Sequence, residues 1–215
     1  MAMYDDDMYP VQFSVDYPEE PRNRLTVLAR IILVIPIIII FTLINRYAFG
    51  QNGDMDPDMV VGVWVAATGL WVATLLMILF RKKYPRWWFD WALELNRFGA
   101  RVGAYALLWR DEYPSTDEEQ AVHLDIAYPD VEGQLNRFMP IIKWLLAIPH
   151  YIVLTVLWII ALIVTVIAWF AILIVGRYPR GMFDFVVGVD RWSFRVIAYE
   201  LLLTTDRYPP FRLEN

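Results

Sequence analysis

The sequence predicts a mainly α-helical membrane protein built from two tandem repeats. Each repeat is expected to hold a short strand, a transmembrane or re-entrant helical hairpin and an interfacial amphipathic helix. Three observations lead to this fold class: apolar residues make up 58 % of the 215 residues, several long stretches carry almost no charge, and a series of short motifs occurs twice in the same order. A soluble domain of this length could not bury so much apolar surface.

Composition excludes several kinds of site. The chain has no Cys, so it forms no disulfide and offers no thiol nucleophile or thiolate metal ligand. Its formal net charge of −5 argues against nucleic acid as a partner. Charged residues still make up 20 % of the chain, so some parts must face water.

The first repeat is expected to begin with a strand and a membrane hairpin. Residues 11–16 (VQFSVD) alternate apolar and polar side chains before a Tyr-Pro turn, as a short strand does. Residues 25–44 are the first candidate span, in which Arg30 is expected to reach the interface and Pro36 to kink the helix. Residues 59–80 carry no charge and form the clearest span.

The span at residues 59–80 also carries a stripe of small residues at helical spacing. In lipid, such stripes let two helix backbones approach closely. We therefore expect helix packing along four positions. They are Gly62, Ala66, Gly69 and Ala73.

A basic Tyr-Pro turn and an amphipathic helix complete the repeat. Residues 87–109 combine one narrow polar stripe with a broad, Trp-rich apolar surface. This pattern is typical of a helix that lies in the plane of the membrane interface.

The second half of the chain repeats these motifs in the same order. Residues 122–129 (VHLDIAYP) match residues 11–18 (VQFSVDYP), and Lys143 matches Arg30. Later motifs recur at a constant offset. The matched pairs are Arg86 and Arg180, Phe89 and Phe183, Arg97 and Arg191, Arg101 and Arg195, and Tyr105 and Tyr199. Many matches in one order indicate a duplication, so we expect one membrane repeat at residues 1–114 and another at residues 115–215.

The longest apolar stretch, residues 141–175, has two interpretations. A helix over residues 144–175 would be roughly 48 Å long, which is long for one upright crossing and short for two full crossings. By comparison with the first repeat, we interpret the stretch as a tight hairpin that turns near residues 158–164. One tilted helix is the alternative.

The basic residues indicate an orientation. Most of them flank the same ends of the two predicted hairpins, whereas the opposite loop sets Arg46 against three Asp residues. By the positive-inside rule, both termini should be cytoplasmic.

Four motifs of the second half carry a resemblance to a known family. They are AIPH at residues 147–150, YPRGMFD at 178–184, RWSFRVIAY at 191–199 and DRYPPF at 206–211. These motifs resemble the bacterial domain-of-unknown-function family 4389 (DUF4389), here in two tandem copies. The resemblance implies an integral membrane protein of bacteria, hence of the cytoplasmic membrane, with no assigned activity and no catalytic residue to transfer. The first copy departs from the pattern, with Ile37 in place of His150.

Two patterns offer candidate chemistry, and each has a plainer interpretation. His150 lies in the apolar stretch, where it could bind a metal, haem or chlorophyll, but a lone neutral His is more often hydrogen-bonded to its neighbours. Residues 54–58 (DMDPD) resemble the start of a calcium loop, but Met59 stands where the loop requires Gly. We therefore expect no metal and no cofactor.

Arginines of the basic turns and polar stripes are the candidate contact residues. The plain interpretation is internal salt bridging; the alternatives are lipid phosphates, which suit the planar guanidinium fork, and a protein partner. The candidates are Arg86, Arg97, Arg101, Arg180, Arg191 and Arg195.

No pattern predicts an enzyme, because the chain shows no nucleophile elbow, phosphate loop or paired-His metal motif. We expect a structural or accessory subunit, or a scaffold, of a larger membrane assembly. Its expected partners are membrane lipids and other membrane subunits or copies of itself, and not nucleic acid. The alternative is a channel or transporter component formed by oligomerisation, because tandem membrane repeats are common in transporters.

Overall fold

The computed structural model describes residues 8–48, 72–116 and 118–214, and this part of the chain is mainly helical. A short apolar helix at Val72–Arg81 precedes α3. In chain order the labelled elements are β1 (Val11–Val15), α1 (Arg24–Ala48), α3 (Arg86–Ala106), β2 (Val122–Ile126), α4 (Met139–Val175) and α5 (Arg180–Glu200).

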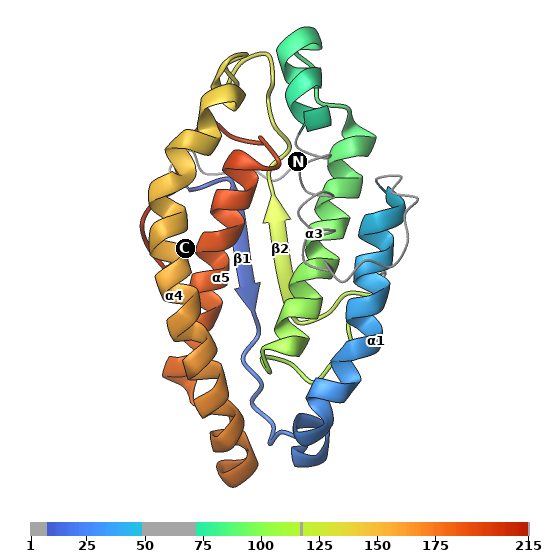
Figure 1. Ribbon diagram of the computed structural model, residues 1–215, viewed down its shortest axis with the longest axis vertical. Coiled ribbons are helices and arrows are strands. Elements are labelled where there is room, and N and C mark those ends of the chain that lie inside the picture. Colours follow the sequence, from blue (N-terminus) through green and yellow to red (C-terminus); the bar gives the residue numbers. More distant parts are fainter. Residues whose placement is uncertain (1–7, 49–71, 117, 215) are drawn as a thin grey trace.

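The elements lie side by side about a central pair of strands (Figure 1). β1 and β2 form an antiparallel two-stranded sheet in which Val11 pairs with Ile126 and Val15 with Val122. α5 lies beside β1 and α3 beside β2, while α4 packs outside α5 and α1 outside α3. α1 and α4 run in opposite directions along the long axis of the molecule.

Alternate residues of both strands are buried, which confirms the strands predicted from the period of two. Val11, Phe13 and Val15 are buried in β1, and Leu124 is buried in β2. Phe13 also packs against Phe194 of α5, with ring centroids 4.9 Å apart. Two strands alone are marginally stable in water, so the sheet depends on the helices that cover it.

α3 and α5 both begin directly after a Tyr-Pro turn. Pro85 and Pro179 have nearly the same backbone conformation, with φ −60° and ψ 134° for Pro85 and φ −61° and ψ 126° for Pro179. Proline suits this place because its φ is fixed near the helical value and it has no N–H to leave unpaired. The two predicted amphipathic segments are therefore confirmed as helices, and buried aromatic residues such as Phe89 and Phe183 face the core.

α4 is one continuous helix from Met139 to Val175. The predicted hairpin near residues 158–164 is therefore wrong, and the single-helix alternative is right. Those residues include no Gly, Pro or charged side chain, and an open turn in apolar surroundings would leave backbone N–H and C=O groups unpaired. α4 ends at Gly176, whose left-handed backbone (φ 80°) directs its N–H to the Ile172 carbonyl at 2.8 Å.

Because α4 is one continuous helix, the flanking basic residues lie elsewhere than a hairpin would place them. Arg137 and Lys143 are near its start, whereas Arg177 and Arg180 follow its end. A helix of this length extends roughly 55 Å, so these cations lie at opposite ends of α4 and not at one end of a hairpin. These positions do not support the prediction that both termini are cytoplasmic, because that prediction depended on a hairpin.

α4 buries one stripe and exposes the rest of its surface. The buried residues are Pro140, Lys143, Ala147, His150, Leu154, Ala161, Thr165, Ala168 and Ile172. Large apolar side chains cover the remaining surface, with Ile152 65 % and Ile174 75 % exposed. Within residues 8–48, 72–116 and 118–214, α4 is the one helix long and apolar enough to cross a membrane. Water-soluble monomers rarely expose so extended an apolar surface, so α4 indicates an association with membranes.

The other predicted spans are described in part. Residues 25–44 are helical within α1, which continues on both sides of Pro36. Of the small-residue stripe, Gly62, Ala66 and Gly69 lie outside the described residues, and Ala73 is half-buried in the helix Val72–Arg81.

Candidate functional site

A cluster of charged side chains joins the start of α1 to the segment that follows α3. Arg22 donates from Nε and Nη2 to the two carboxylate oxygens of Asp111, both at 2.8 Å. Arg30 forms a second ion pair with the same carboxylate. The Trp109 carbonyl accepts a further hydrogen bond from Arg22, and the Arg110 carbonyl accepts one from Arg30. The expectation that Arg30 reaches the membrane interface is therefore wrong, because its partners hold it inside the protein.

Lys143 of α4 is held in a similar way. Its Nζ lies 2.7 Å from the Asp206 carboxylate and donates to a backbone carbonyl at 2.7 Å. It also lies 5.0 Å from the ring centre of Tyr199, as the Arg30 guanidinium lies 3.9 Å from the ring centre of Tyr105. A buried charge is tolerated when it is paired and hydrogen-bonded. Lys143 and Arg30 both meet this condition through internal contacts.

Two arginines of the predicted polar stripes bind strand carbonyl groups. Arg97 of α3 donates from Nε to the Leu124 carbonyl, and Arg191 of α5 donates from Nε to the Phe13 carbonyl, both at 2.8 Å. Arg97 also pairs with the Asp125 carboxylate at 2.7 Å. A strand at a sheet edge leaves backbone groups unpaired, and these guanidinium groups bind two of them.

Arg101 and Arg195 make the next matching pair of contacts. Nη1 of Arg101 donates to the Ser115 carbonyl at 2.8 Å, and Nη1 of Arg195 donates to the Arg212 carbonyl at 2.9 Å. Burial, and to a lesser extent the nearby Arg212 and Arg191, lowers the pKa of Arg195 to about 10. This arginine stays charged at neutral pH. Four of the six candidate arginines thus donate hydrogen bonds to backbone carbonyl groups of the protein.

Arg86 and Arg180 differ from the other four because they are exposed. Each guanidinium lies over the ring of a tyrosine from the other half of the chain. Arg86 is 4.8 Å from the ring centre of Tyr128, and Arg180 is 5.2 Å from that of Tyr17. Arg86 also pairs with Asp90 at 3.3 Å, an exposed ion pair of the kind that contributes little. An anion can therefore approach both guanidinium groups.

Tyrosines connect each Tyr-Pro turn to the other half of the chain. The Tyr17 hydroxyl donates to the Tyr178 carbonyl, and the Tyr128 hydroxyl donates to the Tyr84 carbonyl. Burial raises the pKa of Tyr84 and raises that of Tyr178 to about 12. Tyr84 and Tyr178 therefore remain neutral over the physiological range.

His150 lies buried among aromatic side chains. Its ring stacks on Phe211 with centroids 4.1 Å apart, and Tyr208 lies at 4.7 Å. The Trp192 indole N–H, which can only donate, points at Nδ1 from 3.1 Å. Nδ1 is therefore the acceptor, and the proton of the neutral imidazole is on Nε2. Because Nε2 then has no lone pair for a metal, the geometry argues against His150 as a metal, haem or chlorophyll ligand.

No group of three His, Asp or Glu side chains in the described part of the chain is placed to hold a metal ion. The calcium-loop pattern at residues 54–58 lies outside the described residues.

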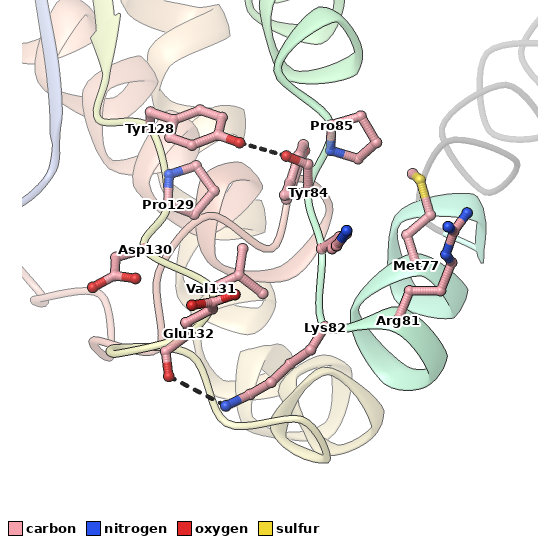
Figure 2. A pocket seen from close by; sticks show the side chains of 11 residues that line it. Met77, Arg81, Lys82, Tyr84, Pro85, Tyr128, Pro129, Asp130, Val131 and Glu132 are labelled. Carbon is pink, nitrogen blue, oxygen red and sulfur yellow. Dashed lines mark hydrogen bonds between the residues drawn. The ribbon is translucent and has the colours of Figure 1, made fainter.

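An open pocket of about 740 Å³ lies beside the basic Tyr-Pro turn at residues 81–85. One wall is the basic turn at residues 81–85, together with Met77 of the preceding helix. The other wall is the loop at residues 128–132, which connects β2 to α4 (Figure 2). Two hydrogen bonds join the walls: the bond from Tyr128 to Tyr84, and one from Lys82 Nζ to the Glu132 carbonyl at 3.2 Å. The pocket is thus held open between two connected segments.

Sequence reasoning missed Asp111, Asp206 and this pocket. A signal for the two carboxylates was present, because Arg30 and Lys143 are lone cations in apolar helices and such cations need a partner. Along the sequence, Asp111 follows the end of α3 and Asp206 follows the end of α5 by a similar number of residues. No sequence pattern, however, brings residues 128–132 next to residues 81–85.

Among the comparisons with known proteins, a family match was found, and it lies in the second half of the chain. Residues 140–212 match the family described as Domain of unknown function (DUF4389). The match spans α4 and α5 and covers one of the two expected copies; residues 1–139 lie outside it. No curated protein and no solved structure matches the chain. The family carries no activity that could be transferred to this site.

Proposed function

We propose that the chain is a structural or accessory subunit of a larger assembly in the cytoplasmic membrane of a bacterium. In this proposal it is a multi-pass protein whose spans are residues 25–44, residues 59–80 and α4. It consists of two tandem repeats, at residues 1–114 and 115–215, and the family match of residues 140–212 falls within the second. Its role is to offer apolar surface to partner subunits and to bind lipid at its basic turns.

The outer surface of α4 is the observation that carries this proposal. Lys143 is the only Lys, Arg, Asp or Glu of α4, and it is buried. Apart from Thr155, the exposed side chains along the helix are mainly large and apolar, among them Ile159, Leu162 and Val166. Each 100 Å² of such surface costs about 2.5 kcal/mol in water, so a helix this long requires lipid or another apolar chain around it.

Matched contacts support the two repeats. Equivalent residues of the two halves make equivalent interactions, several of them across the halves. The pairs of interactions are Tyr17 to Tyr178 and Tyr128 to Tyr84; Arg97 to Leu124 and Arg191 to Phe13; Arg86 over Tyr128 and Arg180 over Tyr17; and Arg30 over Tyr105 and Lys143 over Tyr199. A duplicated chain retains such pairs because the same local sequences meet in the same way.

A channel or transporter component formed by oligomerisation is the alternative function. It would require polar side chains where copies meet. On α4, Lys143, His150 and Thr165 belong to the buried stripe. The exposed Thr155 hydroxyl donates to the Tyr151 carbonyl of its own helix, so these groups would not line a path between copies. The outer face of α4 therefore favours the accessory role.

Purification from native membranes tests the proposal. We expect a tagged chain to resist extraction by alkaline carbonate and to copurify in mild detergent with a defined partner or with a second copy of itself. Leu162→Asp, which places a charge on the outer face of α4, should release the chain or its partner, whereas Leu162→Ala should not. Release of the wild-type chain by carbonate, or a monomer in lipid without a partner, would contradict the proposal.

A further inference from the structure

The pocket beside the basic turn at residues 81–85 carries opposite charges on its two walls. Arg81 and Lys83 line one wall, are exposed, and make no hydrogen bond or ion pair with another described residue. The Glu132 side chain lines the facing wall and likewise forms no ion pair with a described residue. Lys82 and Asp130 have internal partners, the Glu132 carbonyl and the Gly133 N–H. Arg81, Lys83 and the Glu132 carboxylate thus have no partner among the described residues, and Lys82 and Asp130 keep their charges beside them.

The pocket also adjoins an apolar helix face. The helix Val72–Arg81 ends at the basic turn, and its Leu76 and Phe80 side chains are exposed, Phe80 by 72 %. In the proposed membrane placement, residues 59–80 leave the bilayer at this point. The pocket would then lie at the depth of the lipid headgroups, with Phe80 beside the acyl chains.

We infer that this pocket binds a phospholipid headgroup that carries both a phosphate and a primary amine, as phosphatidylethanolamine does. The phosphate faces Arg81 and Lys83, and the ammonium group faces Glu132. The acyl chains lie along Leu76 and Phe80. This inference deepens the proposed function and rests on it, since it requires the chain to lie in a membrane.

The separation of charge selects among headgroups. A purely anionic headgroup such as phosphatidylglycerol gains from the two cations but brings no positive charge to Glu132. A choline headgroup has a positive charge but no N–H to donate to a carboxylate, whereas an ammonium group has three. A volume of about 740 Å³ lies in the range of ligand pockets and can hold a headgroup with its glycerol.

The second half of the chain provides a matched control. Val175, Gly176 and Arg177 stand where the first half has Arg81, Lys82 and Lys83. The second turn therefore has one cation where the first has three. Arg177→Gln removes a comparable exposed charge without touching the pocket.

Native mass spectrometry of the purified full chain tests the inference. The probes are phosphatidylethanolamine, phosphatidylglycerol and phosphatidylcholine with identical acyl chains, supplied in equal amounts. We expect phosphatidylethanolamine to be retained preferentially. Arg81→Gln combined with Lys83→Gln should weaken its retention at least about tenfold, and Arg177→Gln should leave the preference for phosphatidylethanolamine unchanged. Glu132→Gln should abolish the preference over phosphatidylglycerol.

Free phosphoethanolamine distinguishes a lipid from a soluble ligand. We expect it to compete only at concentrations far above those of the lipid, because it lacks acyl chains. Competition at equal concentration would show a soluble ligand instead and would overturn the lipid assignment. Equal retention of the three lipids, or unchanged retention in the Arg81 and Lys83 double variant, would overturn the inference. Carbonate resistance of each variant, measured on the membranes before purification, separates these outcomes from a failure of the proposed function.

Discussion

Lys82 ends the helix Val72–Arg81 in a left-handed backbone conformation (φ 48°), at the position where Gly176 (φ 80°) ends α4. This conformation costs a side-chain-bearing residue about 1 kcal/mol, and it costs glycine little. We therefore expect Lys82→Gly to raise the free energy of unfolding by about 1 kcal/mol and Gly176→Ala to lower it by about as much. Chemical denaturation in detergent measures both changes.

Lys82→Ala is the control for the first of these variants. It removes the bond from Lys82 Nζ to the Glu132 carbonyl but retains the backbone conformation. If Lys82→Gly were no more stable than Lys82→Ala, the left-handed conformation would carry no cost at this site.

Asp190 of α5 occupies the place that Asn96 occupies in α3. The Asn96 amide donates to the Ala92 carbonyl at 2.8 Å, whereas burial raises the pKa of Asp190 from 3.8 to about 7. Because the pKa is higher in the folded state, the folded chain holds this proton more tightly. The stabilisation is complete below pH 4 and is lost as the pH rises to 7.

Asp190→Asn should therefore remove a pH dependence. We expect the variant to exceed the wild-type chain in free energy of unfolding by at least about 1 kcal/mol at pH 8, with the difference shrinking towards pH 4. Asn96→Asp, at the matched position, should introduce a decline with rising pH. Parallel pH profiles for the Asp190→Asn and wild-type chains would contradict the expectation.

Single residues show why the candidate site was only partly predictable. The periodicity correctly grouped Arg97 with Arg101 on one face of a helix, since spacing along a helix is a local property. It did not show that Arg97 reaches the Leu124 carbonyl, or that Arg30 meets Asp111, because these partners are distant in sequence. A polar residue can be placed on a face from sequence, but its partner requires the packed structure.

At the scale of elements, local patterns predicted both strands and the two helices that follow the Tyr-Pro turns. The hairpin at residues 158–164 was inferred by comparison with the first repeat. The local signal was the more reliable one, since those residues include nothing that ends a helix. In lipid, a segment has its lowest free energy when every backbone N–H and C=O group is hydrogen-bonded, as in a continuous helix.

Spin labels can measure the length of α4. The natural chain has no Cys, so Ile141→Cys with Ile174→Cys creates the only labelling sites, both at exposed positions. For one continuous helix we expect a separation of roughly 50 Å, and roughly 33 Å for Ile141→Cys with Ile163→Cys. A hairpin would bring the first pair within about 20 Å, given interhelical distances of about 10 Å.

At the scale of the whole molecule, the position of α4 decides the membrane topology. If α4 crosses the bilayer, its two ends face opposite sides. We expect a membrane-impermeant maleimide to label Gln134→Cys and Arg177→Cys, both exposed, from opposite sides of sealed vesicles. Permeabilised vesicles are the control for reactivity. Labelling of both positions from one side would contradict a crossing by α4.

The arrangement of the two halves could not be predicted from their similarity. Repeated motifs indicate like units, but they do not say how these units pack. In the structure, α3 of the first half covers β2 of the second, and α5 covers β1 (Figure 1). The sheet itself takes one strand from each half, so neither half closes a core with its own residues.

Separate expression of the halves tests whether each half needs the other to complete its core. We expect residues 1–114 and 115–215 to copurify when they are expressed together, and neither to be a folded monomer when expressed alone. Tyr17→Phe with Tyr128→Phe removes two of the hydroxyl bonds that cross between the halves. At about 1 kcal/mol for each bond, the complex should dissociate roughly thirtyfold more readily. Tyr113→Phe, an exposed tyrosine within the first half, serves as the control. A stable, protease-resistant monomer of residues 115–215 would show that the second half completes its own core, and the contacts between the halves would then join two finished units.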